Sequence, residues 1–184
     1  HPSYLTAREL IRSGEIGELK TIHCDLFSTR AMMFRNGTHL IDMICFYAES
    51  GPEWVTAELE TGFGDFTEYK GDGGHDPAMD PDTAAYIRFQ NGVRAFFNCR
   101  KMNFPGSQMY LQCDEGRIEI SDREAVLVRA TSHREWSRQT IVPASYMHQF
   151  KAGFLPEIVD VLRHGGELVS PAREARKTLE IMLG

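Results

Sequence analysis

Apolar residues recur at helical spacing near both ends of the chain and alternate with polar residues in its middle. The first helical pattern runs from about Ser3 to Ser13, and Gly14 after it is typical of a helix C-terminus. The stretch from Gly17 to Ser28 alternates in part, which predicts a strand. A second helical run follows His39 and carries a wide apolar stripe that ends before Gly51-Pro52. We therefore expect helix, strand and helix in that order.

The middle of the chain predicts strands separated by turns and by one long loop. Gly62 to Pro81 is rich in Gly, Asp and Pro and lacks periodicity, so we expect a surface loop of a length that often carries function. Asn91-Gly92 between two apolar runs is a strong hairpin signal, and Asp114-Glu115-Gly116 marks a second turn. The predicted strands are Trp54–Glu60, Ala85–Phe89, Val93–Cys99, Met109–Cys113, Arg117–Ile120 and Ala125–Arg129.

The C-terminal segment predicts two more helices. Apolar residues from Phe150 to Leu162 are at helical spacing, so Pro156 either kinks this helix or lies in its first turn. Ser170 and Pro171 then predict the N-cap and first residue of a final helix. The inward positions of that helix are expected to be Ala172, Ala175, Leu179 and Met182.

Hairpin-joined strands with helices at both ends of the sequence indicate one α+β domain over residues 1–184, with a largely antiparallel, open-faced sheet covered by helices on one face. The strands carry more large apolar residues than one helix layer hides, and an exposed apolar patch usually marks an interface. A self-associating scaffold is therefore one hypothesis for the chain. The residues concerned are Tyr86, Phe89, Phe96, Phe97, Met109, Tyr110 and Leu111.

The composition and net charge of the chain argue against some classes of binding partner. Of the 184 residues 42% are hydrophobic and 25% charged, which fits a globular domain with its own core. A net charge of −6 and the lack of a basic run argue against nucleic-acid binding, and no apolar run is long enough for a membrane span. The cysteines lie far apart and no secretory leader is present, so we expect reduced thiols and a cytoplasmic protein. They are Cys24, Cys45, Cys99 and Cys113.

The strongest candidate chemistry lies at the start of the second helix. On a helix, Arg35, His39 and Asp42 share one face, which suits proton transfer beside a bound polar substrate. His39 is the candidate acid/base, or a histidine bonded to a backbone carbonyl. Arg35 either binds a carboxylate or phosphate or is a solvated residue. Asp42 either binds substrate or acts as a catalytic carboxylate, or it makes a structural contact with a backbone amide or an arginine.

Asn36 and Thr38 are candidate contacts to substrate hydroxyls, although both residue types also cap helices. Tyr146 and His148 are interpreted as ordinary loop residues rather than parts of the same cleft. No metal site is predicted in the long loop, because the spacing of its ligand-type residues matches neither a calcium nor a zinc pattern. Those residues are Asp72, His75, Asp76 and Asp80.

Two segments carry a family resemblance. Ala7 to Leu19, followed about twenty residues later by Gly37-Thr38-His39-Leu40-Ile41-Asp42, resembles the C-terminal domain of the Gfo/Idh/MocA family, the glucose-fructose oxidoreductase and inositol dehydrogenase relatives. The closing segments Phe150 to Gly166 and Ser170 to Leu183 resemble its last helices. The resemblance implies a dihydrodipicolinate-reductase-like C-terminal fold. It also implies a missing N-terminal Rossmann domain, and a chain that opens without methionine and closes inside a helical pattern fits such a fragment of a two-domain protein.

The resemblance further implies the substrate-binding and oligomerisation half of an NAD(P)-dependent oxidoreductase acting on a sugar, cyclitol or related polyol, with His39 as acid/base. NAD or NADP would be bound mainly by the missing domain, since this sequence contains no G-x-G-x-x-G, and the isolated chain would be inactive. Relatives pair through the sheet, so a homodimer or tetramer is expected.

Many relatives have an aspartate four residues before the histidine, where this chain has Arg35. This substitution indicates either an altered substrate, such as one bearing a carboxylate, or a member with weak or absent dehydrogenase chemistry. A non-catalytic ligand-binding or scaffold domain that kept the fold is therefore the alternative function.

Overall fold

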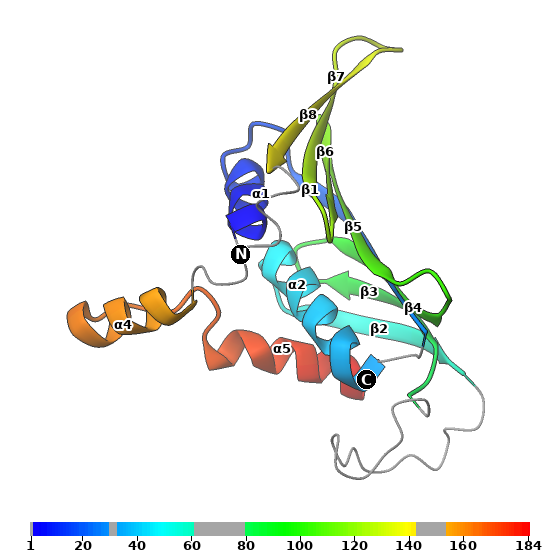
Figure 1. The fold of residues 1–184 in the computed structure, drawn as a ribbon, viewed down its shortest axis with the longest axis vertical. Coiled ribbons are helices and arrows are strands. Elements are labelled where there is room, and N and C mark those ends of the chain that lie inside the picture. The colour runs from blue at the N-terminus through cyan, green and yellow to red at the C-terminus, as the bar shows by residue number, and fades with distance from the viewer. Residues whose placement is uncertain (1, 30–32, 61–79, 143–153) are drawn as a thin grey trace.

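An eight-stranded sheet organises the described part of the chain, with α1, α2 and α5 on one side of it (Figure 1). The computed structural model describes residues 2–29, 33–60, 80–142 and 154–184. In chain order the elements are α1 (Pro2–Arg12), β1 (Leu19–Ser28), the π-helical turn η1 (Met33–Gly37), α2 (Thr38–Ala48), β2 (Pro52–Leu59), β3 (Thr83–Phe89), β4 (Arg94–Lys101), β5 (Gly106–Cys113), β6 (Gly116–Ser121), β7 (Ala125–Ala130), β8 (Trp136–Val142), α4 (Phe154–His164) and α5 (Ala172–Leu183).

The strands are ordered β2-β3-β4-β1-β5-β6-β7-β8. β1 runs parallel to β4, and every other neighbouring pair is antiparallel. The β3–β4 hairpin closes at the predicted Asn-Gly, where Gly92 has a φ of 88° and the Asn91 amide donates to the Ala48 carbonyl. The predicted α+β class with a largely antiparallel, open-faced sheet is confirmed.

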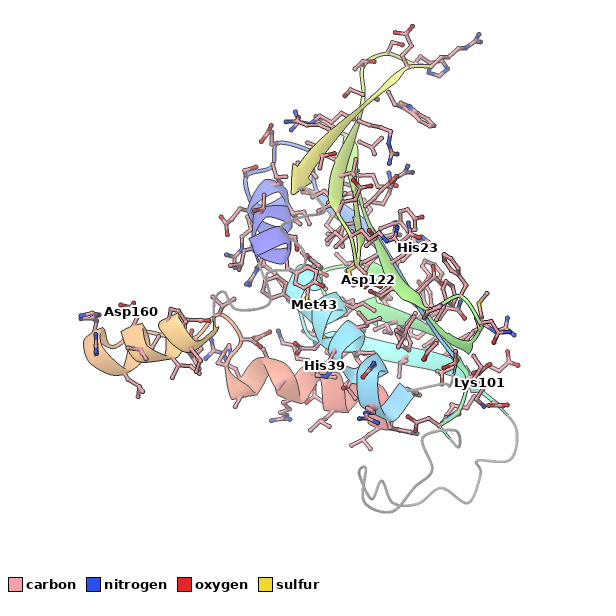
Figure 2. The ribbon with its side chains drawn as sticks, in the orientation of Figure 1. His23, His39, Met43, Lys101, Asp122 and Asp160 are labelled. Carbon is pink, nitrogen blue, oxygen red and sulfur yellow. The ribbon has the colours of Figure 1, made fainter. Side chains whose placement is uncertain are left out.

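Side-chain alternation divides the sheet into two unlike faces. In β1, Ile22 and Cys24 are buried on the face that carries the helices, whereas His23 is exposed on the opposite face. Figure 2 shows His23 on the side of the sheet away from α2. We call this opposite side the open face, because no helix among the described residues covers it. α2 packs its apolar stripe on the other face, and α5 packs against α2 and β2.

Several sequence expectations are corrected. β8 was not predicted, because its exposed, polar residues carry no apolar alternation. The strand residues expected to form an exposed apolar patch are divided between the two faces. Four are buried under the helices, namely Phe89, Phe97, Met109 and Leu111. The other three, Tyr86, Phe96 and Tyr110, lie on the open face. The long loop lies largely outside the described residues, as do Phe150, Tyr146 and His148.

The inward face predicted for the last helix is wrong at Ala172, Ala175 and Leu179, whereas Met182 is half-buried and packs against the core. α5 buries Thr178 and Ile181, whereas Leu179 is 58% exposed and Ala172 and Ala175 are exposed. The physical reason is that α5 docks on α2 through Thr178, which turns Ile181 toward the core and leaves Leu179 and Leu183 exposed. The helix also begins one residue later than predicted, with Pro171 rather than Ser170 at the N-cap.

Glu49 ties the end of α2 to α1 and provides a testable contribution to stability. Its carboxylate accepts from Arg8 at 2.6 Å and from Arg12 at 2.8 Å. Burial by itself would raise the pKa of Glu49, but the two guanidiniums outweigh it and hold this pKa below the ordinary value. A lowered pKa means that the ion pair stabilises the fold at neutral pH and that this contribution is lost as pH falls from about 4 through the lowered value.

Glu49→Gln is therefore expected to lower the free energy of unfolding by about 1 kcal/mol at neutral pH, the size usual for a half-exposed pair. The difference from wild type should vanish under acid conditions, as chemical denaturation at a series of pH values would reveal. Glu115→Gln is the matched control, since its carboxylate forms no ion pair with the described residues. A deficit that persists in acid would contradict the electrostatic explanation.

Candidate active site

The segment before α2 is wound as a π turn, which places the candidate residues at an unusual helix entrance. Met33 at its start is buried and its sulfur accepts from the Thr83 hydroxyl of β3 at 2.9 Å, and Gly37 at its end is also buried. Single π turns occur often at functional sites. The turn thus fixes the approach of Arg35, Asn36 and Thr38 to the helix.

His39 lies in the first turn of α2, and its side chain is exposed. Figure 2 labels His39 near the start of α2, between that helix and α5. No described residue forms a hydrogen bond with the imidazole, so the alternative of a histidine bonded to a backbone carbonyl is not what the described structure contains. The ring is therefore available to an external ligand.

The polar neighbours of His39 are arranged differently from the sequence prediction. Arg35 is half-buried and lies in η1 rather than on α2, so the predicted α-helical stacking of residues 35 and 39 is not the observed geometry. The Thr38 hydroxyl donates to the Arg35 carbonyl at 2.5 Å and caps nothing, because the N-cap is Gly37 without a side-chain bond. The helix-capping interpretation of Asn36 and Thr38 is wrong, and Asn36 is exposed.

Asp42 makes the structural contact that sequence reasoning held open. Its Oδ1 accepts from the Thr178 hydroxyl of α5 at 3.3 Å, which links α2 to the last helix. Leu40 and Met43, which lie one turn apart on α2, line a small gap of about 20 Å³ beside β5. The described residues therefore give His39 one wall of a site rather than a closed cleft.

A separate hollow lies on the open face. It measures about 520 Å³ and is lined by residues of β1, β2, β3 and β4. Its polar lining includes Asp25, Glu58 and Asn98, and the Asn98 amide donates to Asp25 at 3.0 Å. Sequence reasoning missed this hollow, because only the register of the strands brings residues of four strands together there.

The described residues contain neither a metal site nor a membrane-spanning helix. Asp80 is buried, while Asp72, His75 and Asp76 lie outside the described part of the chain. Residues 2–29, 33–60, 80–142 and 154–184 contain no group of three ligand-type side chains that could hold a metal ion. In the same ranges, no helix is both long and apolar enough to cross a membrane.

Comparison with known proteins places this geometry in a family. No curated protein matches the chain. The fold is similar to a dehydrogenase from Chromobacterium violaceum, with a TM-score of 0.75 and 14% identity over 99% of this chain and 56% of that one. It is also similar to a UDP-N-acetylglucosamine 3-dehydrogenase from Acidithiobacillus ferrooxidans, with a TM-score of 0.69 and 11% identity over 96% of this chain and 55% of that one.

A third similar structure is a 3-ketoreductase from Actinomadura kijaniata in complex with NADP, with a TM-score of 0.65 and 13% identity over 97% of this chain and 54% of that one. At these identities the structures establish the fold, and the chain spans little more than half the length of each. The sequence pattern of the GFO/IDH/MocA C-terminal domain matches residues 4–119, which is more than half of the chain. The chain therefore belongs to the GFO/IDH/MocA oxidoreductase family, as a C-terminal domain.

Proposed function

We propose that this chain is the substrate-binding and oligomerisation domain of an NAD(P)-dependent oxidoreductase that acts on a sugar, cyclitol or related polyol, with His39 as its acid/base. The observation that carries the proposal is the exposed imidazole of His39 at the entrance of α2. None of the described residues forms a hydrogen bond with this ring. Similar folds belong to a sugar-nucleotide dehydrogenase and to a ketoreductase in complex with NADP.

Oxidising an alcohol removes its hydroxyl proton as hydride leaves the same carbon, and imidazole is an efficient base near neutral pH. In this proposal a ring nitrogen of His39 accepts that proton. Asn36 and the Thr38 region contact neighbouring substrate hydroxyls, and Asp42 supports the helix from which the imidazole projects. The nicotinamide, when it is bound by a separate domain, would accept the hydride.

The described residues do not themselves fit a dinucleotide. The sequence lacks G-x-G-x-x-G, and the described part of the chain contains no strand, glycine-rich turn and helix unit that could cradle a pyrophosphate. The helix layer is instead suited to receive a second domain, because several of its large apolar side chains are uncovered. These are Leu155, Ile158, Val159 and Leu162 of α4 and Leu179 and Leu183 of α5.

The decisive experiment is turnover by the full-length protein, followed through nicotinamide absorbance with NAD and with NADP. Sugars, cyclitols and sugar acids form the substrate panel, and this chain alone serves as an inactive control. Reduction of either cofactor by any panel member supports the proposal. Tight cofactor binding without turnover of any substrate would contradict it and favour a non-catalytic ligand-binding domain.

Arg35 is the residue proposed to set substrate charge. A guanidinium pairs strongly with carboxylates, so we expect the preferred substrate to be a sugar acid. Arg35→Asp should then lower kcat/KM for sugar acids about 100-fold, equivalent to about 3 kcal/mol of lost charged hydrogen bonding, with a small effect on neutral polyols. Arg134→Asp, in the exposed β7–β8 turn, is the control. Equal losses on acids and polyols would argue against charge recognition.

The open face is proposed as the oligomerisation surface, giving a homodimer or a tetramer. Trp54 and Phe96 are 46% and 40% exposed there, next to Tyr86. A contiguous aromatic surface of this kind usually marks an interface. Sedimentation analysis should therefore detect at least a dimer at micromolar concentration, and a monomer would contradict this part of the proposal.

A cytoplasmic location is proposed from the thiols. The cysteines at positions 24, 45, 99 and 113 are free and buried. Burial raises the pKa of Cys45 to about 12 and that of Cys113 to about 11, which keeps these thiols protonated and unreactive. Free thiols of this kind fit a reducing compartment.

A further inference from the structure

Two buried threonines hold the segment that carries the candidate site. Few polar side chains are buried within the described ranges, and they belong to Ser3, Asp80, Thr83 and Thr178. Thr83 donates to the Met33 sulfur at the start of η1, and Thr178 donates to Asp42 on α2. A buried hydroxyl needs a hydrogen-bond partner. Each threonine therefore fixes one end of the segment from Met33 to Asp42.

The contact at the Asp42 end joins α2 to α5, which pack against each other. The Thr178 hydroxyl donates to Asp42 Oδ1 at 3.3 Å, and the Cys45 thiol, one turn further along α2, forms a hydrogen bond with the same residue. The neighbouring Lys177 pairs instead with Glu174 of its own helix, at 2.6 Å. Within the described residues, hydrogen bonding between α2 and α5 thus rests on the Thr178 hydroxyl.

The position of this contact couples it to His39. Asp42 follows His39 by three residues, so both side chains lie on one side of α2, about one turn apart. The imidazole is exposed and forms no hydrogen bond with the described residues. Since no such bond orients the ring, its place is set by the backbone of the first turn of α2. An anchor on that turn therefore determines where the imidazole lies.

Resting on the acid/base role proposed above for His39, we propose that Thr178 is a positioning residue for the reaction. Its hydroxyl acts through Asp42 and fixes the first turn of α2 at the place from which the imidazole reaches the substrate hydroxyl. A displacement of about 1 Å in a reacting group can cost about 100-fold in rate. Thr178 itself does not contact the substrate, so its contribution belongs to kcat rather than to KM.

Removal of the hydroxyl with little change of shape tests the proposal. In the full-length protein, Thr178→Val should lower kcat about tenfold and leave KM within about twofold of wild type, because the base is displaced while the substrate contacts remain. Thr178→Ser keeps the donor and should retain kcat within about twofold. The matched control is Thr131→Val in the exposed β7–β8 turn, where the hydroxyl donates to the Glu135 carbonyl at 3.0 Å. This control should retain wild-type kcat.

Double variants separate positioning from general damage to the site. In the His39→Ala background there is no base to position, so adding Thr178→Val should cause no further loss of kcat. The same result is expected in the Asp42→Ala background, where the acceptor of the hydroxyl is absent. A substitution that only loosens the fold would instead lower the residual activity in both backgrounds by the same tenfold factor.

A loss of kcat that serine restores and that disappears in both backgrounds supports the proposal. An unchanged kcat in Thr178→Val, or a tenfold loss that persists without His39, overturns it and leaves the proposed function standing. Thr178→Ala also lacks the donor and replaces the valine variant if circular dichroism shows that variant to be unfolded. Failure of both variants to fold makes the contact purely structural and overturns the proposal. A wild type without turnover of any panel substrate overturns the proposed function and this inference together.

Discussion

Replacement of His39 by alanine in the full-length protein is expected to lower kcat/KM by about 10²-fold to 10⁴-fold, the range typical of a lost general base. The imidazole is exposed and hydrogen-bonded to no described residue, so its removal should leave the fold intact. Cofactor binding should also be unchanged, because the proposed nucleotide site lies in another domain. Steady-state kinetics with the preferred substrate from the panel would measure the loss.

Chemical rescue distinguishes a catalytic imidazole from a structural one. Added imidazole should restore part of the activity of His39→Ala, because a free base can occupy the vacated space and accept the same proton. The control is His133→Ala, at the exposed β7–β8 turn, which should keep wild-type activity. A His39→Ala enzyme with nearly full kcat/KM would remove this residue from the mechanism, and an inactive variant without rescue would point to a positioning role.

The sequence predicted those elements whose signals are local. The Asn91-Gly92 turn is one example, since two residues with the right backbone freedom fix the β3–β4 register. α2 is another, because its wide apolar stripe survives as the buried face against the sheet. The position of His39 at a helix entrance was predictable for the same reason.

The remaining features depend on packing between distant segments. β8 forms because it adds to the edge of β7, and its own residues carry little strand signal. The orientation of α5 depends on the Thr178 contact with Asp42, which local apolar spacing does not reveal. The π turn at Met33–Gly37 likewise depends on Met33 packing under β3. The hollow on the open face likewise requires the register of several strands, which sequence alone does not provide.

The division of β4 into two faces yields the largest expected effect on stability. Phe97 points to the helix-covered side and is 2% exposed, in register with Cys24 and Ala85. Phe97→Ala removes a buried ring and leaves a cavity, which costs about 3–5 kcal/mol of unfolding free energy. This is a large part of the total stability of a typical domain and should lower Tm by about 10 °C.

Phe96→Ala is the matched control, since its side chain leaves the same strand toward the open face and is 40% exposed. Its unfolding free energy, measured by chemical denaturation at a protein concentration where dimer is absent, should fall by only about 1 kcal/mol. Its dimer should nevertheless dissociate more readily, because the ring lies on the open face that is proposed for self-association. Equal destabilisation by the two substitutions in the monomer would contradict the assignment of one buried and one open face.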